Sequence, residues 1–150
     1  MSMYLTTSKL PSPQTKKLCM RLKHLFPFCV YKKRGKKSIE EIADEARLLG
    51  KRRACLIYEQ EKVPHRMVFM SINDGWGWLE PEIIIKGFPQ RNIRTQYNNI
   101  KISGSRKKDL LLLLHPRESD YEPIHLRAGE KKLSFVHKKT ELFWIKVGYA

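Results

Sequence analysis

The sequence predicts an α/β fold, and three patterns support this prediction. Residues 1–78 alternate apolar runs typical of strands with two amphipathic segments typical of helices, in the order strand, helix, strand, helix, strand, strand. This order favours parallel pairing of the first strands, because a helical crossover joins parallel neighbours. Residues 79–150 contain mostly short apolar runs separated by turn residues. A chain of 150 residues suits one domain, so we expect a single domain over 1–150 made of these two halves.

The first predicted strand covers residues 3–8 and is followed by a helix with a readable start. Ser12 suits the N-cap and Pro13 the first helical position. Pro27 ends the helix, and residues 28–32 form the second predicted strand. The apolar stripe of this helix consists of Leu18, Leu22, Leu25 and Phe26.

The second predicted helix begins after a basic loop. Ser38 and Glu41 have the spacing of a capping box, and Gly50 is a natural helix stop. Acidic residues in the first turn suit the positive end of the helix dipole. Strands are predicted at 53–60 and 65–72. The buried stripe consists of Ile39, Ile42, Ala46 and Leu49.

The second half is predicted to be rich in strands. A turn cluster at 73–78 precedes it, and we expect Trp76 and Trp78 to seal the joint between the halves. Residues 89–108 read as a polar loop with room for a short helix. The pattern leaves open whether these strands extend the first sheet or build a second one. The predicted strands are 82–88, 109–115, 123–129, 132–138 and 142–148.

The charge balance favours a polyanionic partner. Thirty Lys and Arg against fifteen Asp and Glu give a net charge of +15. Residues 1–78 contribute +9 (sixteen minus seven) and residues 79–150 contribute +6 (fourteen minus eight), so the excess is spread over both halves. Such a surplus favours nucleic acid over small metabolites. The alternatives are a merely soluble basic protein or adaptation to a salty cytoplasm.

Cysteine usage and hydropathy indicate a cytoplasmic protein without metal or membrane. Cys19, Cys29 and Cys55 are odd in number and lie among apolar residues, which is typical of reduced, buried thiols. Their spacing does not fit a structural zinc site. No apolar run is long enough to cross a bilayer, and the first ten residues lack the pattern of a secretion signal.

The sequence lacks the motifs of common enzymes. Gly35-Lys36-Lys37-Ser38 resembles the end of a phosphate-binding P-loop, but Val30 occupies the position of its first glycine and Lys37 interrupts the motif. The acidic residues are scattered or committed to a helix start, so a two-metal nuclease has no ligand set. We therefore expect no catalytic residue, no cofactor and no small-molecule substrate.

Two polar segments are candidates for binding a polyanion. If the first two strands are parallel, residues 7–9 and 32–37 both follow the carboxyl ends of neighbouring strands and meet at one edge of the sheet. Arg34 is the leading candidate, because its planar guanidinium can bind phosphate bidentately, and Gly35 permits a positive φ. Helix N–H groups after the loop add anion affinity. The candidate RNA-binding residues are Thr7, Ser8, Lys9, Lys32, Lys33, Arg34, Gly35, Lys36 and Lys37, with Arg66, Arg106, Lys107 and Lys108 as secondary candidates.

Other readings of these residues remain open. A solvated charge run and a basic targeting signal are the alternatives for the basic loop, and both are weaker than the binding interpretation. Tyr31 and Tyr97 have side chains that stack on unpaired bases, although packing is the commoner role of a lone tyrosine.

Four short motifs occur in the order typical of a known family. They are Thr6-Thr7-Ser8 with Pro11-Ser12, then Phe26-Pro27, then Arg34-Gly35, then a strand and turn from Glu59 to Pro64. Over about residues 3–90 the chain thus resembles the Brix domain of ribosome-biogenesis factors, and further on by strand order alone. It is similar to the short, single-domain archaeal version. It departs from the family at Lys62-Val63, where a glycine is common before the proline.

The resemblance implies a fold and a function. The fold would have two similar halves, each resembling the anticodon-binding domain of class II aminoacyl-tRNA synthetases. The function would be binding of precursor rRNA during ribosomal subunit assembly and rRNA processing, without catalysis and alongside other assembly proteins. Two alternatives share the same charge: a tRNA-binding accessory module, and a protein-interaction scaffold in a ribonucleoprotein whose basic surface meets acidic partner segments.

Overall fold

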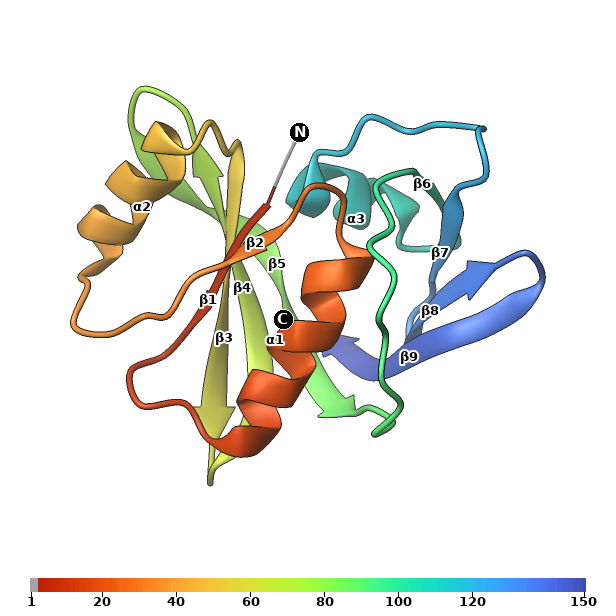
Figure 1. Cartoon of the computed structure of the whole chain (residues 1–150), viewed down its shortest axis with the longest axis horizontal. Helices are drawn as coiled ribbons and strands as arrows, with labels where there is room; N and C mark the ends of the chain where they lie inside the picture. Colours follow the sequence, from red (N-terminus) through yellow and green to blue (C-terminus); the bar gives the residue numbers. More distant parts are fainter. Residues whose placement is uncertain (1–2) are drawn as a thin grey trace.

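The computed structural model describes residues 3–150, which form one nine-stranded sheet with three helices (Figure 1). The strand order is β2-β1-β3-β4-β5-β9-β8-β7-β6, so the second half extends the sheet of the first. The elements are β1 (Met3–Thr7), α1 (Pro13–Leu25), β2 (Val30–Tyr31), α2 (Ile39–Leu48), β3 (Arg53–Gln60), β4 (Val63–Ile72), β5 (Trp76–Gly87), β6 (Ile100–Ser103), α3 (Lys107–Leu114), β7 (Ile124–Ala128), β8 (Lys132–His137) and β9 (Thr140–Tyr149).

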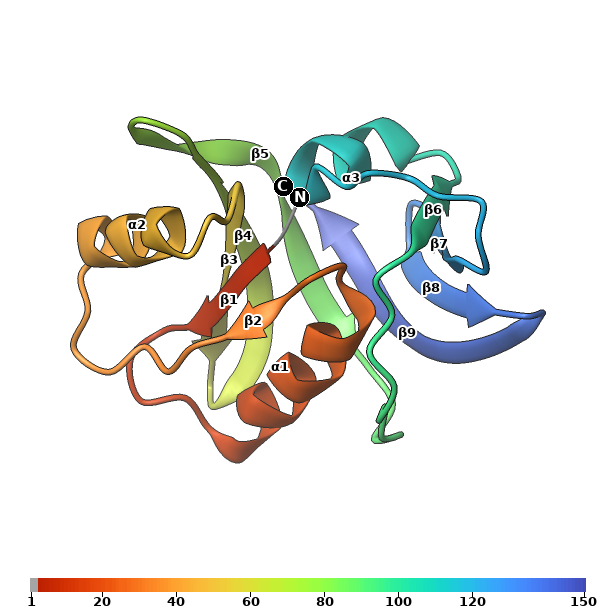
Figure 2. The same cartoon turned by 45° about the horizontal axis from the view of Figure 1, so that its top comes forward.

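The first half is an α/β layer whose leading strands are parallel. β1 lies between β2 and β3 and pairs in parallel with both, as the strand and helix order predicts. α1 packs on one face of the sheet and α2 on the other, on opposite sides of β1 and β3 in Figure 2. The face under α1 continues into the second half, where α3 packs on the same core.

Both long helices begin where their caps predict. The Ser12 side chain accepts a hydrogen bond from the Thr15 N–H at 3.4 Å. Ser38 and Glu41 exchange two bonds of 3.1 Å each, which completes the capping box of α2. α2 ends at Leu48, so Leu49, which was predicted to belong to the buried stripe, lies at the C-cap and is exposed; the prediction is wrong for this residue.

The turn between β3 and β4 forms without glycine. Glu61 and Lys62 both have positive φ, at 52° and 65°, and Pro64 pairs with Glu59 across the hairpin. β4 therefore starts at Val63, two residues before the predicted start. The departure at Lys62-Val63 thus coincides with a tight two-residue turn.

The strand predicted at 109–115 is wrong, because these residues form most of α3. A run of five leucines contains no polar residue, so it shows neither the period of a helix nor that of a strand. Leucine is also a strong helix former. The burial has helical spacing: Leu110, Leu113 and Leu114 are buried, whereas Leu112 is 45% exposed.

The segment predicted as a loop, 89–108, contains a strand and the start of a helix. β6 pairs in parallel with β7 through Ile100–Ile124 and Ile102–Leu126, and α3 begins at Lys107. β2 is also shorter than predicted, at two residues. These short strands depend on distant partners rather than on local sequence.

The two halves pair their strands in a similar sequence. In each, a parallel pair precedes two antiparallel hairpins, and β5 and β9 then pair antiparallel at the centre of the sheet. β5 runs through the expected boundary at residue 78. Trp76 and Trp78, 37% and 46% exposed, pack edge to face on each other, so the prediction that they seal the joint does not fit their placement.

Candidate nucleic-acid interface

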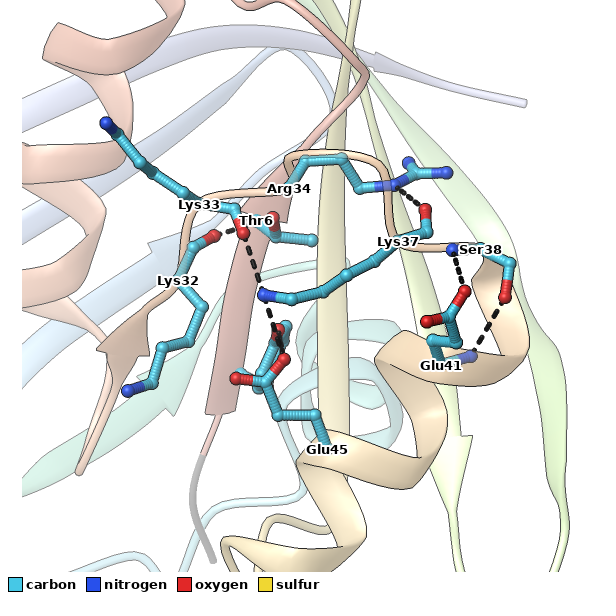
Figure 3. Close-up of polar contacts among 9 residues, drawn as sticks. Thr6, Lys32, Lys33, Arg34, Lys37, Ser38, Glu41 and Glu45 are labelled. Atoms are coloured by element: carbon cyan, nitrogen blue, oxygen red, sulfur yellow. Dashed lines mark hydrogen bonds and ion pairs between the residues drawn. The ribbon is translucent and has the colours of Figure 1, made fainter.

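The two polar segments predicted to meet do meet, at the carboxyl ends of β1 and β2 (Figure 3). The Lys32 N–H donates to the Leu5 carbonyl at 2.9 Å. The Thr6 hydroxyl donates to the Lys32 carbonyl at 2.7 Å, and the Arg34 Nη1 donates to the Thr7 carbonyl at 3.2 Å. We call residues 7–9 and 32–37 together the loop surface.

Arg34 holds the loop surface together from inside. Its side chain is buried, with 7% exposed, and its Nε donates to the Lys37 carbonyl at 2.7 Å. Nε and Nη1 both donate to backbone carbonyls. A guanidinium binds phosphate bidentately through Nε with Nη2 or through Nη1 with Nη2, and each of these pairs already has one nitrogen bonded within the protein. In this conformation Arg34 braces the loop rather than offering the free bidentate fork expected from sequence.

Gly35 meets a conformational need. Its φ is +54°, and the Lys37 N–H closes the turn on the Arg34 carbonyl at 3.2 Å. A Cβ on Gly35 would meet no atom within 4 Å, so the left-handed backbone, and not crowding, requires glycine here.

Lys37 is committed to internal contacts. Its ammonium lies 2.9 Å from Glu45 Oε2 and donates to the Lys33 carbonyl at 2.9 Å. Glu45 also accepts from the Tyr4 hydroxyl at 2.8 Å. The hydrogen bond from Lys37 holds the pKa of Glu45 below its usual value, and the bond from Tyr4 acts in the same direction. The pKa of Tyr4 is raised, mainly by burial and then by its bond to Glu45.

Four lysines of the loop surface are unpaired. Among residues 3–150, no hydrogen bond or ion pair involves their ammonium groups. Three are exposed and Lys32 is half-buried; Figure 3 shows the Lys32 and Lys33 ammonium groups directed away from Arg34 and Lys37. The unpaired set is Lys9, Lys32, Lys33 and Lys36.

The hydroxyls of residues 7 and 8 and the start of α2 contribute less to anion binding than expected. Thr7 is buried and its hydroxyl donates to the Ser8 carbonyl at 2.7 Å, while Ser8 is half-buried. At the start of α2 the capping box and the carboxylates of Glu40 and Glu41 already occupy the positive end of the helix. Attraction for phosphate at this surface therefore comes from the unpaired lysines.

The secondary candidates do not join the loop surface. Arg66, on β4, pairs with Glu82 at 2.8 Å and lines a hollow of about 830 Å³ with Tyr58 and Trp78. Lys107 and Lys108 are exposed on α3, in the second half.

Arg106 also has internal partners. It pairs with Asp109 at 3.0 Å and Glu130 at 2.8 Å, and its guanidinium lies 4.1 Å from the centre of the Tyr149 ring. Arg66 and Arg106 are thus ion-paired, which leaves less of their charge for a ligand.

Both candidate stacking tyrosines are packed. Tyr31 is half-buried against the main core, and Tyr97 lies against His137 with 5.1 Å between ring centres. This is the packing alternative that the sequence left open.

The chemistry of residues 3–150 contains no sign of a metal centre or a reactive thiol. No group of three or more His, Cys, Asp or Glu in this range could hold a metal ion. Burial raises the pKa of Cys29 to about 12, so its thiol stays protonated at neutral pH. No helix in the same range is long and apolar enough to span a membrane.

Sequence reasoning missed the internal partners of the site. Glu45 pairs with Lys37 and accepts a hydrogen bond from Tyr4, yet these two residues lie eight and thirty-three positions from Lys37 along the chain. The helical stripe of α2 gave the one available signal, because Glu45 is adjacent to buried Ala46 and so lies near the sheet.

Comparison with known proteins identifies archaeal relatives. No family model matches the chain. A probable Brix domain-containing ribosomal biogenesis protein from Pyrococcus abyssi is 36% identical over 78 residues, which are 51% of this chain and 35% of the relative. The protein of the same description from Thermococcus kodakarensis is 32% identical over 78 residues, 51% of this chain and 38% of the relative. The matched segment thus spans little more than a third of these relatives.

Solved structures match over nearly the whole chain. The crystal structure of a probable ribosomal biogenesis protein from Aeropyrum pernix K1 superposes with a TM-score of 0.85 at 16% identity, covering 98% of this chain and 95% of that one. Mil, an archaeal Imp4-like protein, superposes with a TM-score of 0.73 at 19% identity, covering 98% of both chains. The Brix-domain resemblance is therefore confirmed: the chain is a homologue of archaeal Brix domain-containing ribosomal biogenesis proteins over half its length, and it has the fold of archaeal Imp4-like proteins.

Proposed function

We propose that this protein is a non-enzymatic ribosome-biogenesis factor that binds precursor rRNA through the loop surface. One observation carries the proposal: two loops joined by Arg34 present four lysines whose ammonium groups form no ion pair within residues 3–150. The net charge of +15 and the similarity to proteins described as ribosomal biogenesis proteins support it.

The arrangement suits contacts to phosphate and ribose. Lysine ammonium groups are point charges that bind phosphate without reading bases, and a braced loop has less freedom to lose on binding. Such a surface recognises RNA by shape and by exposed backbone. The factor would act in the cytoplasm during rRNA processing, with other assembly proteins as further partners.

The test is ultraviolet crosslinking in the native cell, followed by sequencing of the attached RNA. Lys33→Gln with Lys36→Gln removes two exposed charges from the loop surface. Lys16→Gln with Lys17→Gln removes two exposed charges from α1 and serves as the matched control. Reads on precursor rRNA that fall in the loop variant and persist in the control support the proposal.

The other outcomes decide between the alternatives. Reads concentrated on tRNA would favour the tRNA-binding module, in keeping with the anticodon-binding-domain likeness that the family resemblance implies. No RNA above background would overturn RNA binding and leave the lysines to an acidic partner protein.

A further inference from the structure

The second half leaves one face of its sheet uncovered. α1 and α3 pack on the core face, and α2 packs on the opposite face near β3 and β4 in the first half. Over β6 to β9, no helix of residues 3–150 lies on that opposite face, and β8 and β9 form the outer side of the molecule in Figure 1 and Figure 2. We call this surface the outer face.

Strand register places an aromatic ring and polar side chains in one row across the outer face. Ser103 on β6 pairs with Arg127 on β7, Arg127 with Ser134 on β8, and Ser134 with Trp144 on β9. Residues paired across neighbouring strands point to the same side. Their neighbours along each strand are buried in the core, so this row faces outward.

Two lysines lie close to the tryptophan. The pair Lys132–Lys146 lies across β8 and β9 beside the Ser134–Trp144 pair. Their ammonium nitrogens are 5.9 and 5.8 Å from the Trp144 ring centre, within cation–π range. A half-buried aromatic ring close to two cations suits a ligand with a flat π surface and negative charge.

A hollow adjoins this row. It has a volume of about 340 Å³, and Val136 and Pro123 provide its apolar lining. Arg127 and His125 line it from β7, and Lys139 lines it from the β8–β9 turn. Asp120 and Glu122 also line the hollow, and each is paired with a lysine. Apolar surface beside the remaining cations again suits a base joined to a phosphate.

The outer face keeps a surplus of positive charge after its ion pairs are counted. Lys101 pairs with Asp120, Lys132 with Glu141 at 3.0 Å, and Lys138 with Glu122 at 3.4 Å. The cations that remain without a carboxylate in the described part of the chain are Arg127, Lys139 and Lys146. The face is therefore complementary to a polyanion.

We propose that the outer face binds an unpaired stretch of RNA, with one base stacked on Trp144 and the phosphates held by these three cations. An aromatic ring on an open sheet surrounded by basic residues suits unpaired bases, whereas stacked bases in a duplex offer no ring face. The identity of the ligand as RNA rests on the proposed function, but this site is separate from the loop surface.

The test measures fluorescence anisotropy of a labelled oligouridylate of about twelve nucleotides and of an RNA duplex of the same length. Trp144→Leu is expected to weaken single-strand binding by about tenfold or more, because the stacking contact is lost, with duplex binding unchanged. Trp78→Leu, which removes an exposed tryptophan in the first half, is the matched control and retains wild-type affinity.

The charge contribution is measured separately. Arg127→Gln, Lys139→Gln and Lys146→Gln together are expected to reduce the salt slope of single-strand binding by about 2, at about 0.7 per lost phosphate contact. If the charge variant weakens binding while Trp144→Leu binds the oligouridylate as wild type does, the face is merely electrostatic and the stacking proposal is overturned.

Two further measurements keep the outcome decisive. Crosslinking of a 5-bromouridine oligomer to the unmodified protein, followed by mass spectrometry, should label β9 at Trp144; labelling confined to residues 7–37 would overturn the proposal even if a variant misfolds. The Lys33→Gln, Lys36→Gln variant is tested in parallel. If this variant binds the oligouridylate as wild type does while Trp144→Leu binds it more weakly, RNA binding by the loop surface is rejected and RNA binding by the outer face is retained.

Discussion

The guanidinium of Arg34 donates to the carbonyl of Thr7 at 3.2 Å, and this bond joins the loop after β2 to the end of β1. Twenty-seven residues separate the two in sequence. The most buried cation of the basic loop is therefore the one that shapes it, while the exposed lysines carry its available charge.

Arg34→Lys should destabilise the fold by about 1–3 kcal/mol, because a lysine cannot satisfy both carbonyls from the same buried position. The measurement is the free energy of unfolding in urea. Lys33→Gln, an exposed change one residue earlier, should stay within about 0.5 kcal/mol of wild type. Equal losses in the two variants would contradict the bracing role of Arg34.

Gly35→Ala should cost about 1–2 kcal/mol in unfolding free energy, since alanine adopts a left-handed backbone with difficulty. Gly87→Ala is the matched control: a Cβ there also meets no atom within 4 Å, but φ is not positive. Gly35→Asn should recover part of the loss, because asparagine tolerates this conformation better than alanine. An unchanged Gly35→Ala protein would show that the turn takes another conformation.

Glu45→Gln should flatten the dependence of stability on acidic pH. The folded-state pKa of Glu45 lies below its usual 4.5, chiefly through the bond from Lys37. The charged carboxylate thus stabilises the fold above about pH 4.5, and this contribution is lost as pH falls through the lowered folded-state value. Urea midpoints compared between pH 7 and pH 3 measure the change.

The control for that comparison is Glu80→Gln. Glu80 is exposed, and its carboxylate has no hydrogen bond or ion pair within the described residues. Its variant should keep the wild-type pH dependence. A Glu45→Gln protein with the same pH dependence as wild type would exclude the Lys37–Glu45 pair as a contributor to stability.

Leu114→Ala should destabilise the fold by about 2–5 kcal/mol, whereas Leu112→Ala should cost less than about 1 kcal/mol. Leu114 is 5% exposed and Leu112 is 45% exposed. The two would share one face in a strand, so unequal losses in unfolding free energy support the helix and equal losses favour a strand.

Local signals allowed the first half to be predicted well. Ser12 and Ser38 mark helix starts through bonds to residues three positions away, which a sequence window contains. β6 could not be read in the same way, since Ile100 and Ile102 form a strand only by pairing with Ile124 and Leu126. The leucines of α3 were difficult for another reason. Every position in the run is apolar, so the sequence does not show which leucines become buried in the fold.

The position of the candidate site could be predicted from the sequence, but its internal hydrogen bonds and ion pairs could not. Parallel order was enough to bring residues 7–9 and 32–37 to one end of the sheet. The sequence could not show which cations of the loop make internal contacts, because the partner of Arg34 is the distant Thr7 carbonyl and the partner of Lys37 is the Glu45 carboxylate. Charge in a sequence shows how many cations exist, and only the fold shows which remain unpaired.

The antiparallel junction of β5 and β9 makes the two halves one cooperative unit. Ile83 pairs with Tyr149, Ile84 with Gly148 and Ile85 with Val147, so backbone hydrogen bonds and core side chains cross the centre of the sheet. A fragment ending after β5 would carry an unprotected strand with open N–H and C=O groups, and so would a fragment beginning at β6. Each fragment would gain stability by pairing with any available strand, so the intact chain protects both of its halves against aggregation.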